Sequence, residues 1–425
     1  MKKLLPLLLI AALLLAACGS AAETESEATR IVFNGSAVEI HGGGAKDEGA
    51  VVKIGSAGSY VLSGSGEERQ VVVDTGDNPM EVTLILEGLT LSNSGGAVIH
   101  IVQAGNFRLQ LAEGTENTLI SGDKTMLGSV DPEQSGAALY SEDDMDIEGS
   151  GRLTVCGYLN NGIACKDDLD INAGVVTVVA ANNGVKGNDS VEIKGGVLNI
   201  TAQGDGIKSA ELDTADKGFI TISGGDVTVV SDGDGIQAAT DLRITGGTLA
   251  VTARGDGESA SSKALKAGRA LTLEGGSVLV SSQEDGLRAQ SVRVLGGSLE
   301  LRALGDGIQS GVKGSGVGDV SIEGGTLLLL TGKQAVQPEG LFLVTGGELT
   351  AVIGSTKQIE PQTVLPRLFC AIKGAAGDTL RIGEHGPGVE AAFSYKTVLR
   401  VGAELVSGES VVVSNGTNTV SALVK

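Results

Sequence analysis

A repeated Gly-Gly pair constrains the fold of this chain more than any other feature. Seven such pairs recur at intervals of 21 to 29 residues, at 195–196, 224–225, 246–247, 275–276, 296–297, 324–325 and 346–347. Alternating apolar residues flank each pair, and most pairs are followed by Gly-Asp-Gly-Ile or a close variant. Self-similarity at this period is typical of a solenoid, in which each repeat buries its apolar side only against its neighbours.

Each repeat contains three short segments with strand periodicity. Residues 198–202 alternate between apolar and polar side chains, and Asp205, Gly206 and Ile207 follow as a turn and a short strand. Three period-2 strands joined by Gly turns in about 22 residues predict one coil of a parallel β-helix. The same pattern extends from about residue 35 to about residue 355. The sequence therefore predicts an all-β chain with a parallel β-helix over 31–355.

The last segment, 356–425, breaks this repeat but still alternates in places. We interpret it as a C-terminal β-rich cap, because an open coil edge would template aggregation. Sustained helical periodicity is absent beyond the N-terminus, so little helix is expected. Glycine is abundant, at 66 of 425 residues, while the charged fraction of 20% is ordinary. The glycine excess therefore indicates turns and not disorder.

Residues 1–18 have the features of a bacterial lipoprotein signal peptide. Lys2 and Lys3 precede an apolar run that is too short to span a bilayer, and Leu-Ala-Ala-Cys at 15–18 matches a lipobox. By this resemblance we expect lipidation of Cys18, a flexible tether over 19–30, and an extracytoplasmic protein anchored by lipid to the cell surface. An ordinary secretory signal is the alternative.

The chain is strongly acidic and poor in reactive side chains. Its net charge is −21, and loss of Lys2 and Lys3 with the signal would make it −23. Such a surface argues against nucleic acid and anionic lipid as partners and favours cations. Repeat alignment predicts a buried free thiol at Cys165 and an outward Cys156. The three histidines, His41, His100 and His385, share no spacing and are expected at the surface.

Stacked repeats turn each repeat position into a row of side chains about 4.8 Å apart. Two acidic groups follow. The Gly-Asp-Gly row precedes the short strand and comprises Asp205, Asp234, Asp256, Asp285 and Asp306, with Asn161 and Asn183 before them. The acidic corner follows the short strand and comprises Asp143, Asp144, Asp167, Asp168 and Asp189.

Crowded carboxylates of this kind suit Ca²⁺, which takes hard oxygen ligands. We predict metal ligands at the acidic corner and, with less support, at Asp205 and Asp234. The alternative is structural, because Asp-Gly is common turn chemistry and an Asp side chain can cap backbone N–H groups. For the Gly-Asp-Gly row this alternative is the favoured one. The row is expected to be interrupted after Asp256 and at 333–336.

Between the two acidic groups runs an outward row of cations and amides. This cation row comprises Lys186, Lys208, Gln237, Lys266, Arg288, Gln309 and Gln337. Salt bridging to the neighbouring aspartates is one interpretation. The other is a linear groove for a long anionic polymer, held by Lys and Arg directly and by Ca²⁺ bridges to carboxylates. All of these residues except Gln337 are predicted to contact the ligand.

Several segments resemble, in their order and in their amino-acid sequence, a family of secreted bacterial carbohydrate-binding proteins with a polysaccharide-lyase-like, right-handed β-helix. They are SEDDMDIEG at 141–149, NNGIACKDDLDI at 160–171, NNGVKGNDSVEIKGG at 182–196, GDGIKS at 204–209, DKGFITISGG at 216–225 and GDGIQA at 233–238. The resemblance covers roughly 80–425. It implies Ca²⁺ sites in the helix wall and binding of cellulose or acidic, pectin-type sugars, without implying lyase activity.

Three classes of function compete. We favour a monomeric, surface-anchored module that binds acidic or cellulosic polysaccharide. A Ca²⁺-dependent lyase or hydrolase of uronic-acid polymers is the second, with Lys186 or Lys208 as the base, but the sequence shows repeated rows and no unique constellation. A structural surface protein or adhesin is the third. The chain has no Trp, six Phe and four Tyr, which disfavours stacking on a flat aromatic platform and favours acidic glycans.

Overall fold

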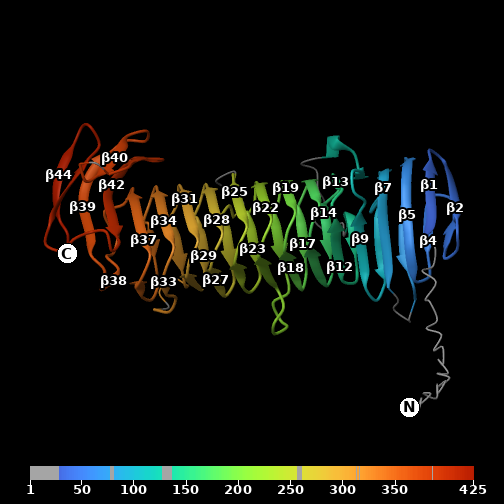
Figure 1. The fold of residues 1–425 in the computed structure, drawn as a ribbon, viewed down its shortest axis with the longest axis horizontal. Helices are drawn as coiled ribbons and strands as arrows, with labels where there is room; N and C mark the ends of the chain where they lie inside the picture. The colour runs from blue at the N-terminus through green and yellow to red at the C-terminus, as the bar shows by residue number, and fades with distance from the viewer. Residues whose placement is uncertain are drawn as a thin grey trace, which may run out of the picture.

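The computed structural model describes residues 28–76, 81–126, 136–255, 261–312, 314, 316–384 and 386–425. The molecule is elongated, with the first strands at one end and the last strands at the other (Figure 1). Most of its strands fall into three rows of hydrogen-bonded, mainly parallel strands, which we name ladders 1, 2 and 3. Within the described residues, the helical structure is a single 3₁₀ turn, η1 (Lys124–Met126).

The ladders are built from strands of three to six residues along most of their length. Ladder 1 contains β1 (Thr29–Asn34), β5 (Gly58–Gly66), β7 (Val82–Asn93), β10 (Glu116–Ser121), β13 (Arg152–Gly157), β16 (Val175–Ala180), β19 (Val197–Ala202), β22 (Asp226–Ser231), β25 (Thr248–Ala253), β28 (Ser277–Ser282), β31 (Ser298–Ala303), β34 (Thr326–Thr331) and β37 (Glu348–Ile353). Ladder 2 contains β3 (Ala45–Asp47), β4 (Val51–Ile54), β6 (Gln70–Asp74), β8 (Ile99–Gln103), β11 (Ala137–Ser141), β14 (Asn161–Cys165), β17 (Val185–Gly187), β20 (Ile207–Ser209), β23 (Ile236–Ala238), β26 (Leu265–Ala267), β29 (Leu287–Ala289), β32 (Ile308–Ser310) and β35 (Val336–Gln337). Ladder 3 contains β9 (Phe107–Leu111), β12 (Met145–Gly149), β15 (Asp168–Ile171), β18 (Ser190–Ile193), β21 (Phe219–Ile222), β24 (Leu242–Ile244), β27 (Ala270–Leu273), β30 (Ser291–Val294), β33 (Val320–Ile322), β36 (Phe342–Val344) and β38 (Gln362–Thr363), and it receives the first half of β7.

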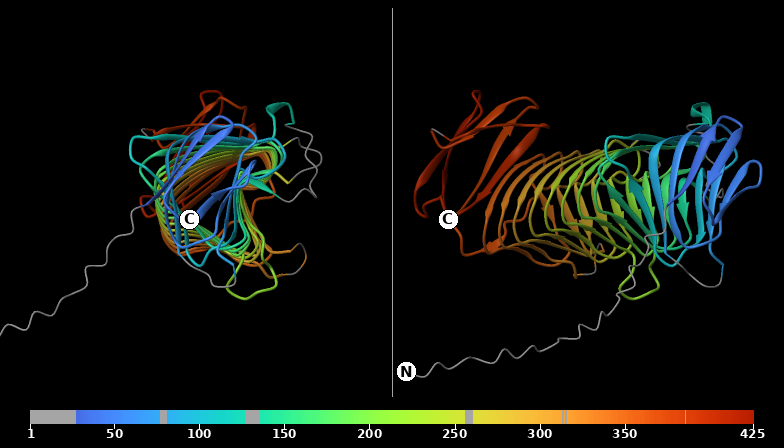
Figure 2. Two further views of the ribbon diagram at one scale, coloured as in Figure 1. Left: turned by 90° about the vertical axis from the view of Figure 1, so that its right-hand side faces the viewer. Right: turned by 45° about the vertical axis from the view of Figure 1, so that its right-hand side comes forward.

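From β10 onward the chain visits ladders 1, 2 and 3 in the same order in each repeat, and each strand pairs in parallel with its equivalent one repeat later. Inward side chains from all three ladders join one continuous apolar core, and each full burial contributes about 1.5–3 kcal/mol. The views of Figure 2 show the repeats stacked along the long axis. The prediction of an all-β chain with parallel strands is confirmed, and the arrangement is compatible with a β-helix or solenoid.

The Gly-Gly pairs lie between ladder 3 and ladder 1, where successive repeats come closest together. The second glycine of the 224–225 pair, Gly225, has φ +84°. A Cβ built there would lie 2.9 Å from the carbonyl oxygen of Gly196, which accepts the N–H of Asp226. Glycine is therefore needed both for the left-handed backbone and for the close approach of this turn to the preceding repeat.

Both ends of the parallel ladders meet antiparallel strands. At the first, β2 (Ala37–His41) pairs with β1. At the last, β42 (Tyr395–Val401) pairs with β37 and with β39 (Arg367–Gly374). A separate sheet is formed by β41 (Gly388–Glu390), β40 (Thr379–Ile382), β43 (Ser410–Ser414) and β44 (Thr419–Leu423). Among the described residues, no helix has the length and hydrophobicity needed to cross a membrane.

Candidate functional site

The acidic corner lies where the chain passes from ladder 2 to ladder 3. Asp143 and Asp144 precede β12, Asp167 and Asp168 lie at the start of β15, and Asp189 precedes β18. Parallel pairing of these strands stacks the three turns, so residues far apart in the sequence become neighbours. One carboxylate oxygen from each of Asp143, Asp144 and Asp167 lies within 4.8 Å of the others.

The other two aspartates of the corner have different partners. The Ser190 hydroxyl donates a hydrogen bond of 2.6 Å to Asp168 Oδ1. The carboxylate of Asp189 forms an ion pair with Lys217, from the next repeat. The structure thus brings together three of the five predicted ligands. The assignments of Asp168 and Asp189 as metal ligands stay predictions.

Burial and like charge make the three clustered carboxylates costly to ionise together. Burial raises the pKa of Asp144, and the negative charges of Asp168, Asp143 and Asp189 raise it further. Burial also raises the pKa of Asp167, with Asp189 and Asp144 adding to the effect. A divalent cation would offset this repulsion, and three carboxylates are the hard oxygen donors that Ca²⁺ takes. The residues present therefore fit a Ca²⁺ ion.

The backbone behind the acidic corner is held by inward side chains that donate hydrogen bonds. The Ser141 hydroxyl donates to the carbonyl oxygen of Asp143 at 2.6 Å. One repeat later, the Cys165 sulfur lies 3.0 and 3.2 Å from the carbonyl oxygens of Asp143 and Asp168. Cys165 is a buried free thiol, as predicted, and burial raises its pKa. The inward thiol therefore supports the turn as a neutral donor.

The Gly-Asp-Gly row forms a chain of turn caps that runs from repeat to repeat. Asn183 Oδ1 accepts the N–H of Asp205 at 3.2 Å, and Asp205 Oδ1 accepts the N–H of Asp234 at 2.9 Å. The second oxygen of each aspartate pairs with a lysine: Asp205 with Lys208 at 2.7 Å and Asp234 with Lys266 at 2.8 Å. This geometry favours the turn-capping interpretation, and metal binding by Asp205 and Asp234 stays a prediction.

The row is interrupted near the places that the sequence indicates. Leu265 pairs with Ile236 and Leu287, which puts Lys263 in the position of the expected aspartate. Asp256 itself lies outside the described residues. Further along, Gln334 takes the aspartate position, and its N–H donates to Asp306 Oδ1 at 2.8 Å.

The cation row is a continuous row on ladder 2. Strand register places each member beside the next, in the order Lys186, Lys208, Gln237, Lys266, Arg288, Gln309 and Gln337. Two of its lysines, Lys208 and Lys266, are neutralised by the aspartates named above. The Arg288 guanidinium donates to the carbonyl oxygen of Gly311 at 3.1 Å. Two of the row's four positive charges are therefore already compensated by carboxylates.

Lys186 differs from the other cations of the row. Within the part of the chain that the structure describes, no hydrogen bond or ion pair holds its ammonium group. Burial, and then the positive charge of Lys208, lower its pKa. Among the described residues, Lys186 is therefore a lysine of the row whose charge no carboxylate compensates.

Other residues singled out in the sequence have these positions. Cys18, the signal segment and His385 lie outside the described residues. Cys156 is buried, although its position in β13 alternates with inward residues. His41 lies at the surface, whereas His100 is half-buried, stacks on Tyr140 with ring centroids 5.1 Å apart and contacts Glu142 at 2.9 Å.

The outer face of ladder 3 carries candidate side chains that were not among the predicted site residues. One row runs through Asp146, Asp170, Glu192, Thr221, Arg243, Thr272 and Arg293. A parallel row places Asp168 beside Ser190 and Ser190 beside Phe219. The insertion over 210–218 enters this face just before Phe219. The alternation of residues 219–222 was a signal that Phe219 points outward.

Comparisons with known proteins agree with the sequence resemblance. A family model for carbohydrate-binding domain-containing proteins matches residues 48–302 and 289–423. A protein of the same description from Acetivibrio thermocellus is 36% identical over 129 residues, which is 30% of this chain and 45% of that relative's length. A gadolinium derivative of a polysaccharide lyase-like protein from C. thermocellum has 30% sequence identity and a TM-score of 0.49, covering 68% of this chain and 98% of the other.

Proposed function

Because the chain belongs to the family of carbohydrate-binding domain-containing proteins, we propose that it binds an extended polysaccharide along its outer surface. The family match, which spans most of the chain, carries this proposal. The geometry supports it, because strand pairing lines up outward polar side chains in rows that follow the stacked repeats. A linear polymer of repeating units can contact such a row at several successive positions.

The proposal includes three finer properties. The fold is a right-handed parallel β-helix, the hand that crossover connections between parallel strands nearly always take. A Ca²⁺ ion is held by Asp143, Asp144 and Asp167 and stabilises the acidic corner. The protein is attached to the outside of the cell through lipid on Cys18. The fit of three clustered carboxylates supports the second property, and the sequence pattern alone supports the first and the third.

Both acidic and cellulosic polymers remain candidate ligands, and they require different surfaces. An acidic polymer would contact Lys186 and would need Ca²⁺ to bridge its carboxylates to the acidic protein surface. A neutral polymer needs hydrogen-bonding pairs and an apolar ring instead. The compensated charges of Lys208 and Lys266 weaken the case for a strongly cationic groove.

Titration calorimetry with two oligosaccharides of equal length tests the proposal. Cellohexaose is the neutral probe and hexagalacturonate is the anionic one, each measured with Ca²⁺ and with EDTA. Binding of either probe supports the proposed function. Loss of hexagalacturonate binding in EDTA, together with weakening in salt, would assign that ligand to the metal and the cation row. If neither probe binds under any condition, the proposed function is wrong.

One observation favours a second candidate, cleavage of uronic-acid polymers. A proton-abstracting base needs a lowered pKa, and Lys186 has one. Lyase action on polygalacturonate would generate unsaturated uronate ends that absorb in the ultraviolet. This product should vanish in Lys186→Gln and persist in the matched variant Lys46→Gln, which changes an exposed lysine outside the row. A wild-type protein that generates no such product excludes this candidate.

A further inference from the structure

An insertion and an aromatic side chain interrupt the polar surface of ladder 3 at one repeat. Strand pairing puts Phe219 in the row position that Ser190 and Asp168 occupy in the two preceding repeats. On the other side, Ile220 N–H donates to the carbonyl oxygen of Asp241, which places Asp241 next in the row. The Phe219 ring is half-buried and points outward. An apolar ring therefore replaces the polar side chains of the two preceding repeats.

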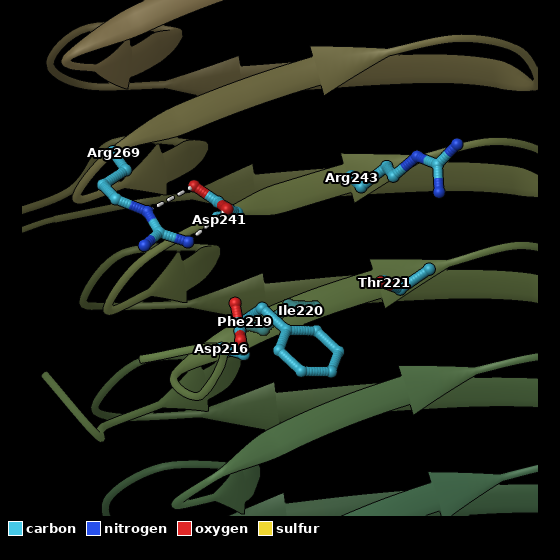
Figure 3. A pocket seen from close by; sticks show the side chains of 7 residues that line it. All are labelled: Asp216, Phe219, Ile220, Thr221, Asp241, Arg243 and Arg269. Atoms are coloured by element: carbon cyan, nitrogen blue, oxygen red, sulfur yellow. Dashed lines mark hydrogen bonds and ion pairs between the residues drawn. The ribbon is translucent and has the colours of Figure 1, made fainter. Parts of the chain in front are cut away.

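The Phe219 ring lines a surface pocket of about 270 Å³. Figure 3 shows the ring next to Asp216, with the Asp241–Arg269 pair on one side and Thr221 and Arg243 further along the strands. The pocket volume lies just below the range of about 300–1,000 Å³ that small-molecule sites occupy. It suits one sugar ring and not a large ligand.

Both arginines of the pocket are already paired with carboxylates through two hydrogen bonds each. Arg269 donates from Nε at 3.1 Å and from an amino group at 2.6 Å to Asp241. Arg243 donates from Nε at 2.7 Å and from an amino group at 2.9 Å to Glu274. A guanidinium has five N–H donors, so each arginine keeps donors for a ligand while its charge is compensated. The pocket thus offers fixed hydrogen bonds without a net positive charge.

The insertion continues the surface on the other side of the ring. A second pocket of about 390 Å³ adjoins the first, sharing Asp216 and Phe219 with it. Its charged lining residues are Asp168, Asp170, Glu192, Asp216, Lys194 and Lys217. Carboxylates outnumber lysines there, so an anionic sugar would be repelled from this side as well.

The insertion is held in place by its own hydrogen bonds. Glu211 Oε1 accepts the N–H groups of Asp213 and Thr214, both at 2.9 Å. The Thr240 hydroxyl donates to the carbonyl oxygen of Lys217 at 2.7 Å, and Lys217 pairs with Asp189. Because the insertion is held in place before a ligand binds, it loses little conformational entropy on binding.

We infer that Phe219 and the two arginine–carboxylate pairs form a subsite for a neutral pyranose ring of the bound polysaccharide. The C–H face of the sugar packs on the Phe219 ring, and its hydroxyls exchange hydrogen bonds with Arg243, Arg269 and Asp241. Binding sites of this kind combine an aromatic contact with a few well-placed polar groups. This inference rests on the proposed function and narrows its ligand at this face to neutral sugars.

The test uses the whole protein with cellohexaose and hexagalacturonate as probes. Phe219→Ser introduces the side chain that the row has at Ser190, so the strand should tolerate it. Loss of a central aromatic contact should weaken cellohexaose binding about tenfold or more and leave hexagalacturonate binding unchanged. The matched control is Leu279→Ser, which removes an outward apolar side chain that is 46% exposed on ladder 1. It should change neither affinity.

A second measurement reports on the site without removing the ring. The chain has no Trp, so Phe219→Trp is a single fluorescent reporter. Its emission should shift to shorter wavelength as cellohexaose saturates, whereas Leu279→Trp should show no shift.

The outcomes separate the subsite from the proposed function. If wild type binds cellohexaose and Phe219→Ser binds it equally well, the subsite is wrong and the proposed function stands. Binding of hexagalacturonate alone also overturns the subsite. Failure of wild type to bind either probe overturns both.

Discussion

At the scale of single residues, one side-chain type serves two purposes in this protein. Asp205 and Asp234 accept a backbone N–H with one oxygen and pair with a lysine through the other. Asp144 also accepts a backbone N–H, that of Asp168, but it shares with Asp167 a crowded site in which burial and neighbouring carboxylates raise the pKa values of both. The first arrangement stabilises a turn by itself. The second is costly until a cation is bound.

This difference predicts opposite responses to Asp→Asn substitutions. Asp167→Asn removes one of the clustered carboxylates, so in EDTA it should leave the melting temperature unchanged or raise it slightly. In Ca²⁺ it should abolish the metal-induced rise, which for a native-state ligand at 100 times its Kd is about 2.7 kcal/mol. Thermal unfolding with and without Ca²⁺ measures both effects. Asp205→Asn is the control and should lower the melting temperature equally in both buffers. Equal losses for Asp167→Asn would point to a structural role.

The Asp241–Arg269 pair predicts a pH dependence. The hydrogen bond from Arg269 lowers the pKa of Asp241, and its charge lowers it further against the effect of burial. A carboxyl group whose pKa is depressed in the folded state stabilises the fold at pH values above its unfolded-state pKa, which is near 3.8. This stabilisation is lost as the pH falls through the pKa of the folded state. Asp241→Asn should therefore destabilise by about 1 kcal/mol or less at pH 7, as partly exposed pairs do, and by less still at pH 3. Urea unfolding at the two pH values measures this, and a larger difference at pH 3 would contradict it.

Residue roles were predictable from the sequence only where a repeat position determines the environment. The alignment of Cys165 with small inward residues was enough to predict a buried thiol, because every repeat has the same interior. The role of Phe219 was not predictable, because it depends on the Asp241–Arg269 and Arg243–Glu274 pairs in later repeats. The ion pair of Asp189 depends likewise on Lys217, which the insertion supplies.

At the scale of elements, the strands follow from local alternation, and the turns follow from how closely repeats stack. Residues 198–202 alternate between apolar and polar residues, and their apolar members are buried in the core. Periodicity of this kind is local and can be found in the sequence. The local sequence does not reveal which turn positions tolerate a side chain, because this depends on the carbonyl groups of the preceding repeat.

Two glycines with nearly identical backbone angles separate these effects. Gly225 has φ +84° and Gly383 has φ +85°. A Cβ at Gly383 would meet nothing within 4 Å, while at Gly225 it would lie 2.9 Å from the carbonyl oxygen of Gly196. Gly383→Ala should cost about 1–2 kcal/mol for the left-handed backbone alone. Gly225→Ala should cost about 1–3 kcal/mol more, because the added methyl group must also displace the preceding repeat. Urea unfolding midpoints of the two variants measure the difference, and equal losses would show that stacking adds nothing.

At the scale of the whole molecule, stability depends on how the stack of repeats ends. A solenoid repeat contacts only its neighbours, so the last one needs a cover. Strand β42 pairs along the whole of the edge that β37 would otherwise expose, from Leu349 to Ile353. The cover also buries outward apolar side chains. Leu330 on β34 and Val352 on β37 are each only 2% exposed and belong to the core cluster of the C-terminal strands.

Removal of residues 356–425 should therefore make the chain self-associate. The truncated chain would expose an unpaired strand edge together with Leu330 and Val352, and exposed apolar edges pair with other chains. Size-exclusion chromatography with light scattering should show higher oligomers that increase with protein concentration. Lysines at both apolar positions, Leu330→Lys with Val352→Lys, should restore the monomer to the truncated chain, because charge on an edge strand blocks pairing.

In the full chain, Val398→Lys places a charge on the buried face of β42 and should weaken the cover without removing it, giving a smaller shift toward oligomers. A truncated chain that stays monomeric with an unchanged melting temperature would show that the last repeat needs no cover.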